Sequence, residues 1–362
     1  MRVLFAVFLF VYFFRFQSPL LELGQHQLSH GVTTYRPLIS SLVLTGILML
    51  VQHLVAKGFK FVESLYCFSY LPSALLAVLL TAFVPEMNLS VVIAIGVALL
   101  LFIIVALCTL KCNLIDVHRN ESYAKLFTVH SVGMIGVLMF IGIFSNSNDV
   151  LTYEVQTAHH INAGDYEKAL EAGNQSLATS PRLSALRAYA MARTDTGLGD
   201  RFFAYPLSNA TAEQLLFAPE DTLQQILPPD SLYASFGVWR GQKEPVIRYF
   251  HRVIQRSDNP SAKDYLLTAL LLKKDLLQFA AELRRFYVVA DSVSLPKYYE
   301  QALSIYDQET GRPLAFKNDS VVIEAYQKFL DEGAQYDDEL IRKNQLRRKY
   351  GDTYWWYYHY KN

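Results

Sequence analysis

Residues 126–149 of the chain read LFTVHSVGMIGVLMFIGIFSNSND, a run with no Asp, Glu, Lys or Arg before Asp149 that ends in a short polar segment. A hydrocarbon core about 30 Å thick needs roughly 20 apolar helical residues to cross it. The run Leu126–Phe144 is therefore long enough for a membrane helix. After Asn146 the chain is rich in charged residues and has the pattern of a water-soluble helical protein.

Four further apolar segments precede this one. Leu38–Val55, Ser64–Val84 and Leu89–Leu110 come near the length needed for a crossing, whereas Val3–Phe14 is short and is interrupted by Arg15. We expect the first segment to be retained as a helix, because it is dense in bulky aromatic residues and no signal-peptide cleavage motif follows it. The sequence thus predicts about five transmembrane helices in residues 1–146, embedded in a lipid bilayer.

The distribution of Lys and Arg predicts how these helices are oriented. Cytoplasmic loops carry an excess of positive charge. Six basic residues fall on one side of the proposed helices and two on the other: Arg2, Lys57, Lys60, Lys111, Arg119 and Lys125 against Arg15 and Arg36. We therefore expect a cytoplasmic N-terminus and an extracytoplasmic tail.

Composition restricts the tail further. The whole chain has 33 Lys and Arg against 33 Asp and Glu, and the tail is close to neutral. A nucleic-acid-binding protein would show a concentrated basic excess, so we expect no nucleic-acid partner. Cys67, Cys108 and Cys112 all precede the tail. The tail must therefore hold together by core packing without disulfides.

The tail contains an internal repeat. Gly164–Ala169 aligns with Gly199–Ala204 at an offset of 35 residues, sharing Gly, Asp and Ala at the same spacing. Further turns between helices are predicted at Gly241-Gln242 and at Lys273-Lys274-Asp275. A period in the mid-thirties with two helices in each unit is typical of helical repeat arrays.

These residues resemble the tetratricopeptide repeat. In the best unit, from about Tyr153 to Pro181, the segment Gly164-Asp165-Tyr166 is similar to the turn between the two helices, and Ala169 to the small residue at their crossing. Ala204 takes the same position in the second unit. The unit departs from the family pattern at Thr157 and Gly173. The resemblance implies an α-solenoid over residues 147–362 and hence an all-α fold for the whole chain.

The anchor and tail together also resemble an uncharacterised family of bacterial membrane proteins with tetratricopeptide-like tails. This resemblance implies no known activity, but it implies a place in the bacterial inner membrane with the tail in the periplasm. Repeat arrays of this kind mostly bind other molecules through an extended surface. We therefore expect a non-enzymatic scaffold or binding protein of the cell envelope with a protein or peptide partner.

Histidines are the candidates for chemistry. His26 and His30 are four residues apart, which on a helix places both rings on one face, and His159-His160 opens the tail. With Glu86 they could form an acid–base or metal site at the outer membrane face. A membrane enzyme of cell-envelope glycan or lipid-linked sugar metabolism is thus the alternative function, and a small transporter or channel subunit is a third. Packed or solvated histidines are the simpler interpretation, and we expect no cofactor or metal centre.

The C-terminal run Thr353–Tyr360 is unusually aromatic and follows a basic helix predicted over Asp337–Tyr350. Its side chains could cap the end of the helical array, rest on a bilayer surface, where Trp and Tyr prefer the head-group level, or stack on a ligand. We expect the capping role. Eight residues with two Trp and four Tyr are too apolar to stay solvated at a chain end.

Overall fold

The computed structural model of the protein describes residues 1–59, 61, 63–82, 89–111, 123–217, 227, 229–241, 244–287, 294–311 and 320–361. These residues form helices, turns and irregular segments, and no strand occurs among them. They divide into two compact units, Met1–Asn148 and Asp149–Asn362. The predicted all-α fold is confirmed.

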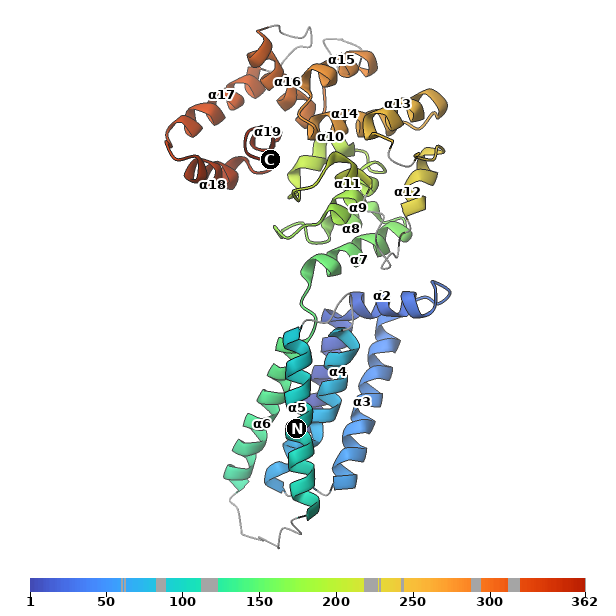
Figure 1. Cartoon of the computed structure of the whole chain (residues 1–362), viewed down its shortest axis with the longest axis vertical. Helices are drawn as coiled ribbons and strands as arrows, with labels where there is room; N and C mark the ends of the chain where they lie inside the picture. The colour runs from blue at the N-terminus through green and yellow to red at the C-terminus, as the bar shows by residue number, and fades with distance from the viewer. Residues whose placement is uncertain are drawn as a thin grey trace. The chain divides into compact units, whose positions relative to one another are not determined.

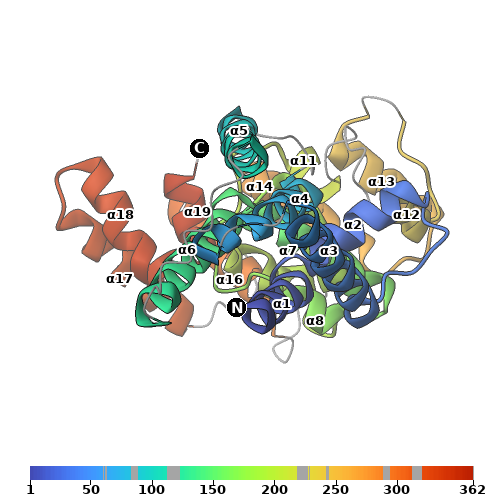
Figure 2. The ribbon, with the colours of Figure 1, turned by 90° about the horizontal axis from the view of Figure 1, so that it is seen from below.

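Unit 1 is a bundle of long helices. Its elements are α1 (Arg2–Val11), a π-helical turn (Tyr12–Phe16), α2 (Ser18–Leu28), α3 (Pro37–Phe59), a 3-10 helix (Glu63–Tyr70), α4 (Leu71–Ala82), α5 (Leu89–Lys111) and α6 (Tyr123–Phe144). Figure 1 shows α3 to α6 side by side, and Figure 2 shows α3, α4 and α5 nearly along their axes. The central helix is α4, which contacts α2, α3, α5 and α6.

Within the described residues, three helical segments are long and apolar enough to cross a membrane: Pro37–Phe59, Leu65–Ala82 and Tyr123–Phe144. The pair Arg2–Phe16 and Ser18–Leu28 is bent by 73° and makes a fourth if it counts as one broken span, and Val91–Leu107 is a shorter apolar helix. Five crossings therefore remain a prediction.

Two of the predicted apolar segments are not continuous α-helices. Residues 63–70 form a 3-10 helix, and α4 begins only at Leu71, with Pro72 in its first turn. Proline is favoured there because the first helical N–H groups have no partner within the helix. Pro19 has the same place at the start of α2, next to the bend. In both places a proline thus lies just after a break in the helix.

Unit 2 is built from shorter helices. They are α7 (Asp149–Asn162), α8 (Tyr166–Glu171), α9 (Pro181–Met191), α10 (Gly197–Arg201), a 3-10 turn (Phe202–Ala204), α11 (Ala212–Phe217), α12 (Pro229–Phe236), α13 (Val246–Arg256), α14 (Ala262–Leu272), α15 (Leu276–Phe286), α16 (Lys297–Thr310), α17 (Ser320–Ala334), α18 (Glu339–Tyr350) and α19 (Tyr354–Tyr360). Most helices pack on their neighbours in the chain, and α14 is buried along nearly its whole length.

The stacking is not purely sequential. Helix α10 contacts both α14 and α16, and α11 also contacts α14. The C-terminal helices α17, α18 and α19 lie together, as Figure 1 shows in red, while α12 and α13 lie on the other side of α14. In a regular array each repeat contacts only the repeats next to it, so contacts between helices far apart in the chain are not expected. The tetratricopeptide-like solenoid therefore remains a prediction.

The two repeated Gly-Asp segments have different structures: Gly164-Asp165 is a turn between helices, whereas Gly199-Asp200 lies inside α10. Gly164 adopts a φ of +77° in the turn between α7 and α8, and Ala169 is fully buried behind it. The expectation for Ala204 was wrong, because α10 ends at Arg201 and Ala204 lies exposed in a 3-10 turn. The close approach is made instead by Gly199, where a Cβ atom would lie 2.6 Å from Cβ of Pro296.

Replacing Ala169 by leucine tests the first crossing. The larger side chain should overpack the contact and lower the free energy of unfolding by about 1–3 kcal/mol. All three tryptophans, Trp239, Trp355 and Trp356, lie in unit 2, so denaturant unfolding of the full chain followed by tryptophan fluorescence reports on this unit alone. The matched control is Ala204→Leu at the exposed position. Equal midpoints for both variants would contradict the assignment of Ala169 to a helix crossing.

The aromatic C-terminus is part of the unit 2 core. It forms α19, which contacts α16 and α18, and Tyr354, Trp355 and Trp356 are buried. The Tyr354 hydroxyl donates a hydrogen bond to the Leu271 carbonyl of α14 (3.0 Å). The predicted role of this run as a structural cap agrees with its position.

A partly buried carboxylate joins α14 to the helices that follow it. The hydroxyls of Tyr287 and Tyr299 donate hydrogen bonds to Oδ1 of Asp264 at 3.2 and 3.1 Å. Burial raises the pKa of Asp264, although the two hydroxyl donors oppose this effect. The folded protein therefore binds a proton at Asp264 more tightly than the unfolded chain does.

This shift predicts how Asp264 affects stability. The stabilising contribution of Asp264 to the free energy of unfolding is fully present below its pKa in the unfolded chain, which is near 4. It is lost as the pH rises through the raised pKa of Asp264 in the folded protein. Asp264→Asn cannot titrate, so the stability of this variant relative to the parent should increase with pH across that window. Urea unfolding between about pH 4 and pH 8 measures the difference, with Asp258→Asn at an exposed position as the control. A difference that is independent of pH would contradict the raised pKa.

Candidate functional site

The histidine pair of unit 1 is not arranged as predicted. Helix α2 ends at Leu28, and His30 lies beyond it with a φ of +50°, so the two rings do not share a helix face. The His26 ring lies against Gly31, whose backbone N–H donates to the His26 carbonyl (2.9 Å). The expected one-face geometry of His26 and His30 is therefore wrong, because the helix ends between them.

His159 and His160 are adjacent in α7, with ring centroids 5.6 Å apart and the rings nearly perpendicular. His159 is exposed, and His160 is partly buried. Burial lowers the pKa of His160, and the neighbouring His159 adds to this effect. The predicted Glu86 lies outside the described residues. Among the residues that are described, no group of three or more His, Cys, Asp and Glu side chains is placed to hold a metal ion.

Unit 1 contains a cluster of hydrogen-bonded polar side chains that the sequence pattern did not predict. The buried Gln52 amide donates to Oγ of Ser69 (2.9 Å) and to the Tyr66 hydroxyl (3.3 Å), which also accepts from Nε of Arg2 (3.0 Å). These contacts join α1 and α3 to the 3-10 helix. Because buried polar groups are costly unless they are hydrogen-bonded, the cluster fixes how these segments pack.

Next to this cluster, the Cys67 thiol lies 3.4 Å from Nδ1 of His130. A Cys–His pair can serve nucleophilic catalysis when the thiol is accessible and ionised. Cys67 is buried, however, and reactive cysteines are at least partly accessible to solvent. We therefore assign this pair to packing.

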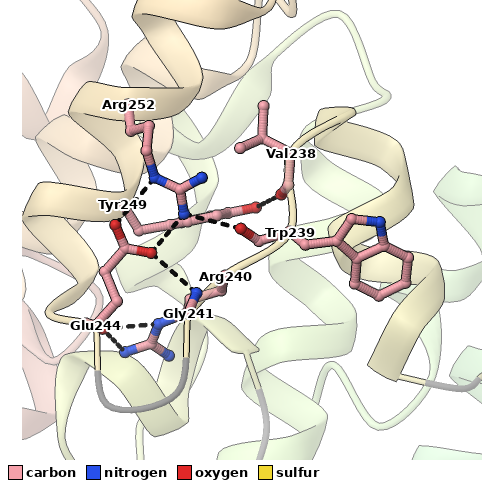
Figure 3. A network of polar contacts seen from close by, with 7 residues as sticks. All are labelled: Val238, Trp239, Arg240, Gly241, Glu244, Tyr249 and Arg252. Carbon is pink, nitrogen blue, oxygen red and sulfur yellow. Dashed lines mark hydrogen bonds and ion pairs between the residues drawn. The ribbon is translucent and has the colours of Figure 1, made fainter.

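In unit 2, one exposed aromatic side chain has an unusually fixed backbone. The Trp239 side chain is 60% exposed and lies in the segment after α12. The backbone carbonyl of Trp239 accepts a hydrogen bond from Nη2 of Arg252 (2.8 Å). The backbone carbonyl of Val238 accepts one from the hydroxyl of the buried Tyr249 (2.7 Å). Both donors come from α13. The indole is directed away from these contacts, as Figure 3 shows.

A carboxylate fixes the same segment from the other side. Glu244 accepts hydrogen bonds from Nε of Arg252 (3.1 Å) and from the Gly241 backbone N–H (3.0 Å), and its own carbonyl accepts one from Nε of Arg240 (2.9 Å). Figure 3 shows these residues around the turn. The hydrogen bonds from Arg252 lower the pKa of Glu244, so the carboxylate stays charged at neutral pH. Charge-assisted contacts of this kind are stronger than neutral hydrogen bonds.

These contacts hold the backbone of the exposed Trp239 in one conformation. Single exposed apolar side chains are normal on proteins and need no explanation. Tryptophan, however, is enriched among the residues that dominate protein interfaces, and a fixed backbone lowers the entropy lost on binding. Trp239 and the surface around it therefore form the candidate binding site. No sequence pattern indicates this site, because the network depends on side chains that meet only after α13 has packed.

Only part of unit 2 matches a known protein family. Residues 241–361, about one third of the chain, match a family of unknown function (DUF6057). This range includes Glu244, Arg252 and α13 to α19 but not Trp239, and no tetratricopeptide family matches. Searches of curated proteins and of solved structures gave no match. The C-terminal part of unit 2 is thus similar to a family without an assigned function.

Proposed function

We propose that this chain is a membrane-anchored binding protein of the bacterial cell envelope. In this proposal, the helices of unit 1 cross the inner membrane about five times, and unit 2 lies on the extracytoplasmic side. Unit 2, as a tetratricopeptide-like helical array, would present a surface centred on Trp239 to a protein or peptide partner. The observation that carries the proposal is the exposed indole of Trp239 on a backbone held by Arg252 and Tyr249.

The long apolar helices of unit 1 support the proposed membrane anchor. Large apolar side chains such as Leu42, Leu50, Ile104 and Ile135 are exposed on these helices. Apolar faces of that extent would cause aggregation in water but are suited to contact with lipid. The positive-charge bias of the loops supports the proposed orientation.

Site-specific photocrosslinking tests the binding proposal. A photoreactive phenylalanine analogue at position 239 of the full chain, in native membranes, should yield an adduct of defined mass with one partner. The matched control carries the same analogue at Leu277, which is 69% exposed on α15. Trp239→Ala should lower partner recovery roughly tenfold or more, as loss of a dominant interface residue does, whereas Leu277→Ala should not. No adduct at position 239, or equal adducts at both positions, would overturn the proposal.

A further inference from the structure

A small pocket in unit 2 lies where three segments meet. It is formed by the residues after α9, the end of α12, and the connection from α13 into α14, and its volume is about 220 Å³. Its lining residues are Ala192, Arg193, Ser235, Phe236, Asn259, Pro260, Ser261 and Tyr265. Pockets for drug-sized ligands are commonly about 300–1,000 Å³. This pocket is therefore suited to a single side chain or a chain end.

The pocket walls are held together by hydrogen bonds between segments. The Ser261 hydroxyl donates to the Ala192 carbonyl (2.9 Å), and the Asn259 amide donates to the Ser235 carbonyl (2.7 Å). The Ser261 backbone N–H donates to Oδ1 of Asn259 (2.9 Å). The hydroxyl proton of Ser261 and one amide proton of Asn259 are thus used to fix the walls.

Arg193 brings an oriented cation to this pocket. Its guanidinium carbon lies 3.4 Å from the centroid of the Tyr189 ring and 5.9 Å from that of Tyr166. Nη1 donates to the Tyr189 carbonyl (3.0 Å), which leaves four of the five N–H groups without a protein partner in the described part of the chain. No described carboxylate forms an ion pair with Arg193.

Tyr265 adds a second donor. Its side chain is almost completely buried, and its ring packs edge-on against Phe236, with the ring centroids 5.0 Å apart. Within the described residues, its hydroxyl has no hydrogen-bond partner. Burial raises the pKa of Tyr265, and the nearby Arg193 opposes this effect. The phenol therefore keeps its proton at neutral pH and can donate it.

We infer that this pocket binds a carboxylate group of the peptide partner. A planar guanidinium with free N–H groups matches the two oxygens of a carboxylate, and the phenol of Tyr265 can complete the set of donors. Phe236 and Tyr265 line the pocket with apolar ring surface, and charge pairing is stronger in a less polar environment. The carboxylate can belong to an acidic side chain or to a peptide C-terminus. The assignment rests on the proposed binding function and names the group that unit 2 selects.

The test uses the full chain in lipid nanodiscs and two displayed libraries of short random peptides, one with free and one with blocked C-termini. Selected peptides should be enriched in Asp or Glu at one position, or should require the free C-terminus. Arg193→Gln should weaken their binding roughly tenfold or more, as loss of a charge-assisted contact does. The control is Arg248→Gln, an exposed arginine on α13. Tryptophan fluorescence checks that each variant is folded.

A double-mutant cycle separates direct pairing from an indirect effect. Amidation of the peptide carboxylate should weaken binding to the parent protein but change little in Arg193→Gln. If selected peptides lack an enriched carboxylate, or if Arg193→Gln binds them as the parent does, the assignment fails while the binding function stands. Tighter binding of a phosphoserine peptide than of its glutamate counterpart would show a phosphate site instead. If no peptide is selected and position 239 gives no adduct, the proposed function fails, and this assignment fails with it.

Discussion

Replacing Trp355 and Trp356 together by alanine is expected to unfold much of unit 2. Truncation of a buried tryptophan costs about 3–5 kcal/mol, and a domain of this kind is stable by only about 5–15 kcal/mol. Both indoles are also hydrogen-bonded: Nε1 of Trp355 donates to the Gln301 carbonyl (3.1 Å), and Nε1 of Trp356 donates to the Lys343 carbonyl (3.2 Å). The double variant therefore loses packing and leaves two carbonyls without these donors.

Thermal unfolding of the full chain, followed by circular dichroism, measures the effect. Trp239→Ala is the control, because that side chain is exposed and its removal should change the free energy of unfolding by less than about 0.5 kcal/mol. A double variant that melted like the parent would contradict the capping role of α19. If that variant also lost affinity for anionic liposomes, contact with the membrane would be the better interpretation of the aromatic run.

The sequence predicted the long helices of unit 1 well. Segments expected at Leu38–Val55, Leu89–Leu110 and Leu126–Phe144 form α3, α5 and α6, with ends that differ by at most four residues. Length and hydropathy are sufficient there, because an apolar run of this length favours a single uninterrupted helix. Where a proline falls near a boundary, as at Pro19 and Pro72, the run is broken, and length and hydropathy alone do not locate such a break.

Local patterns in unit 2 were informative only over short distances. The turns at Gly164 and at Lys273–Asp275 lie between helices as predicted. The second Gly-Asp pattern was misleading, because its helix ends after one turn and Gly199, rather than Ala204, meets Pro296. Packing between segments that are distant in the chain determines which small residue forms the close contact.

The candidate sites illustrate the same limit. His26 and His30 have a suggestive spacing, but spacing predicts a shared face only if the helix continues through both, and α2 ends between them. The Arg193 pocket depends on the Ser261 hydroxyl reaching the Ala192 carbonyl, across 69 residues of sequence. No local motif indicates such a contact, so the pocket could be found only in the folded chain.

The proposed function depends most on the orientation of the chain: unit 1 must cross a membrane and hold unit 2 outside the cytoplasm. The six-to-two bias of basic residues predicts this orientation. Fusions to a reporter enzyme that is active only outside the cytoplasm test it directly. A reporter fused after Asn362 should be active, and one inserted between Lys111 and Lys125 should be inactive. The reverse pattern would contradict the account, because unit 2 would then face the cytoplasm and could not bind an envelope partner.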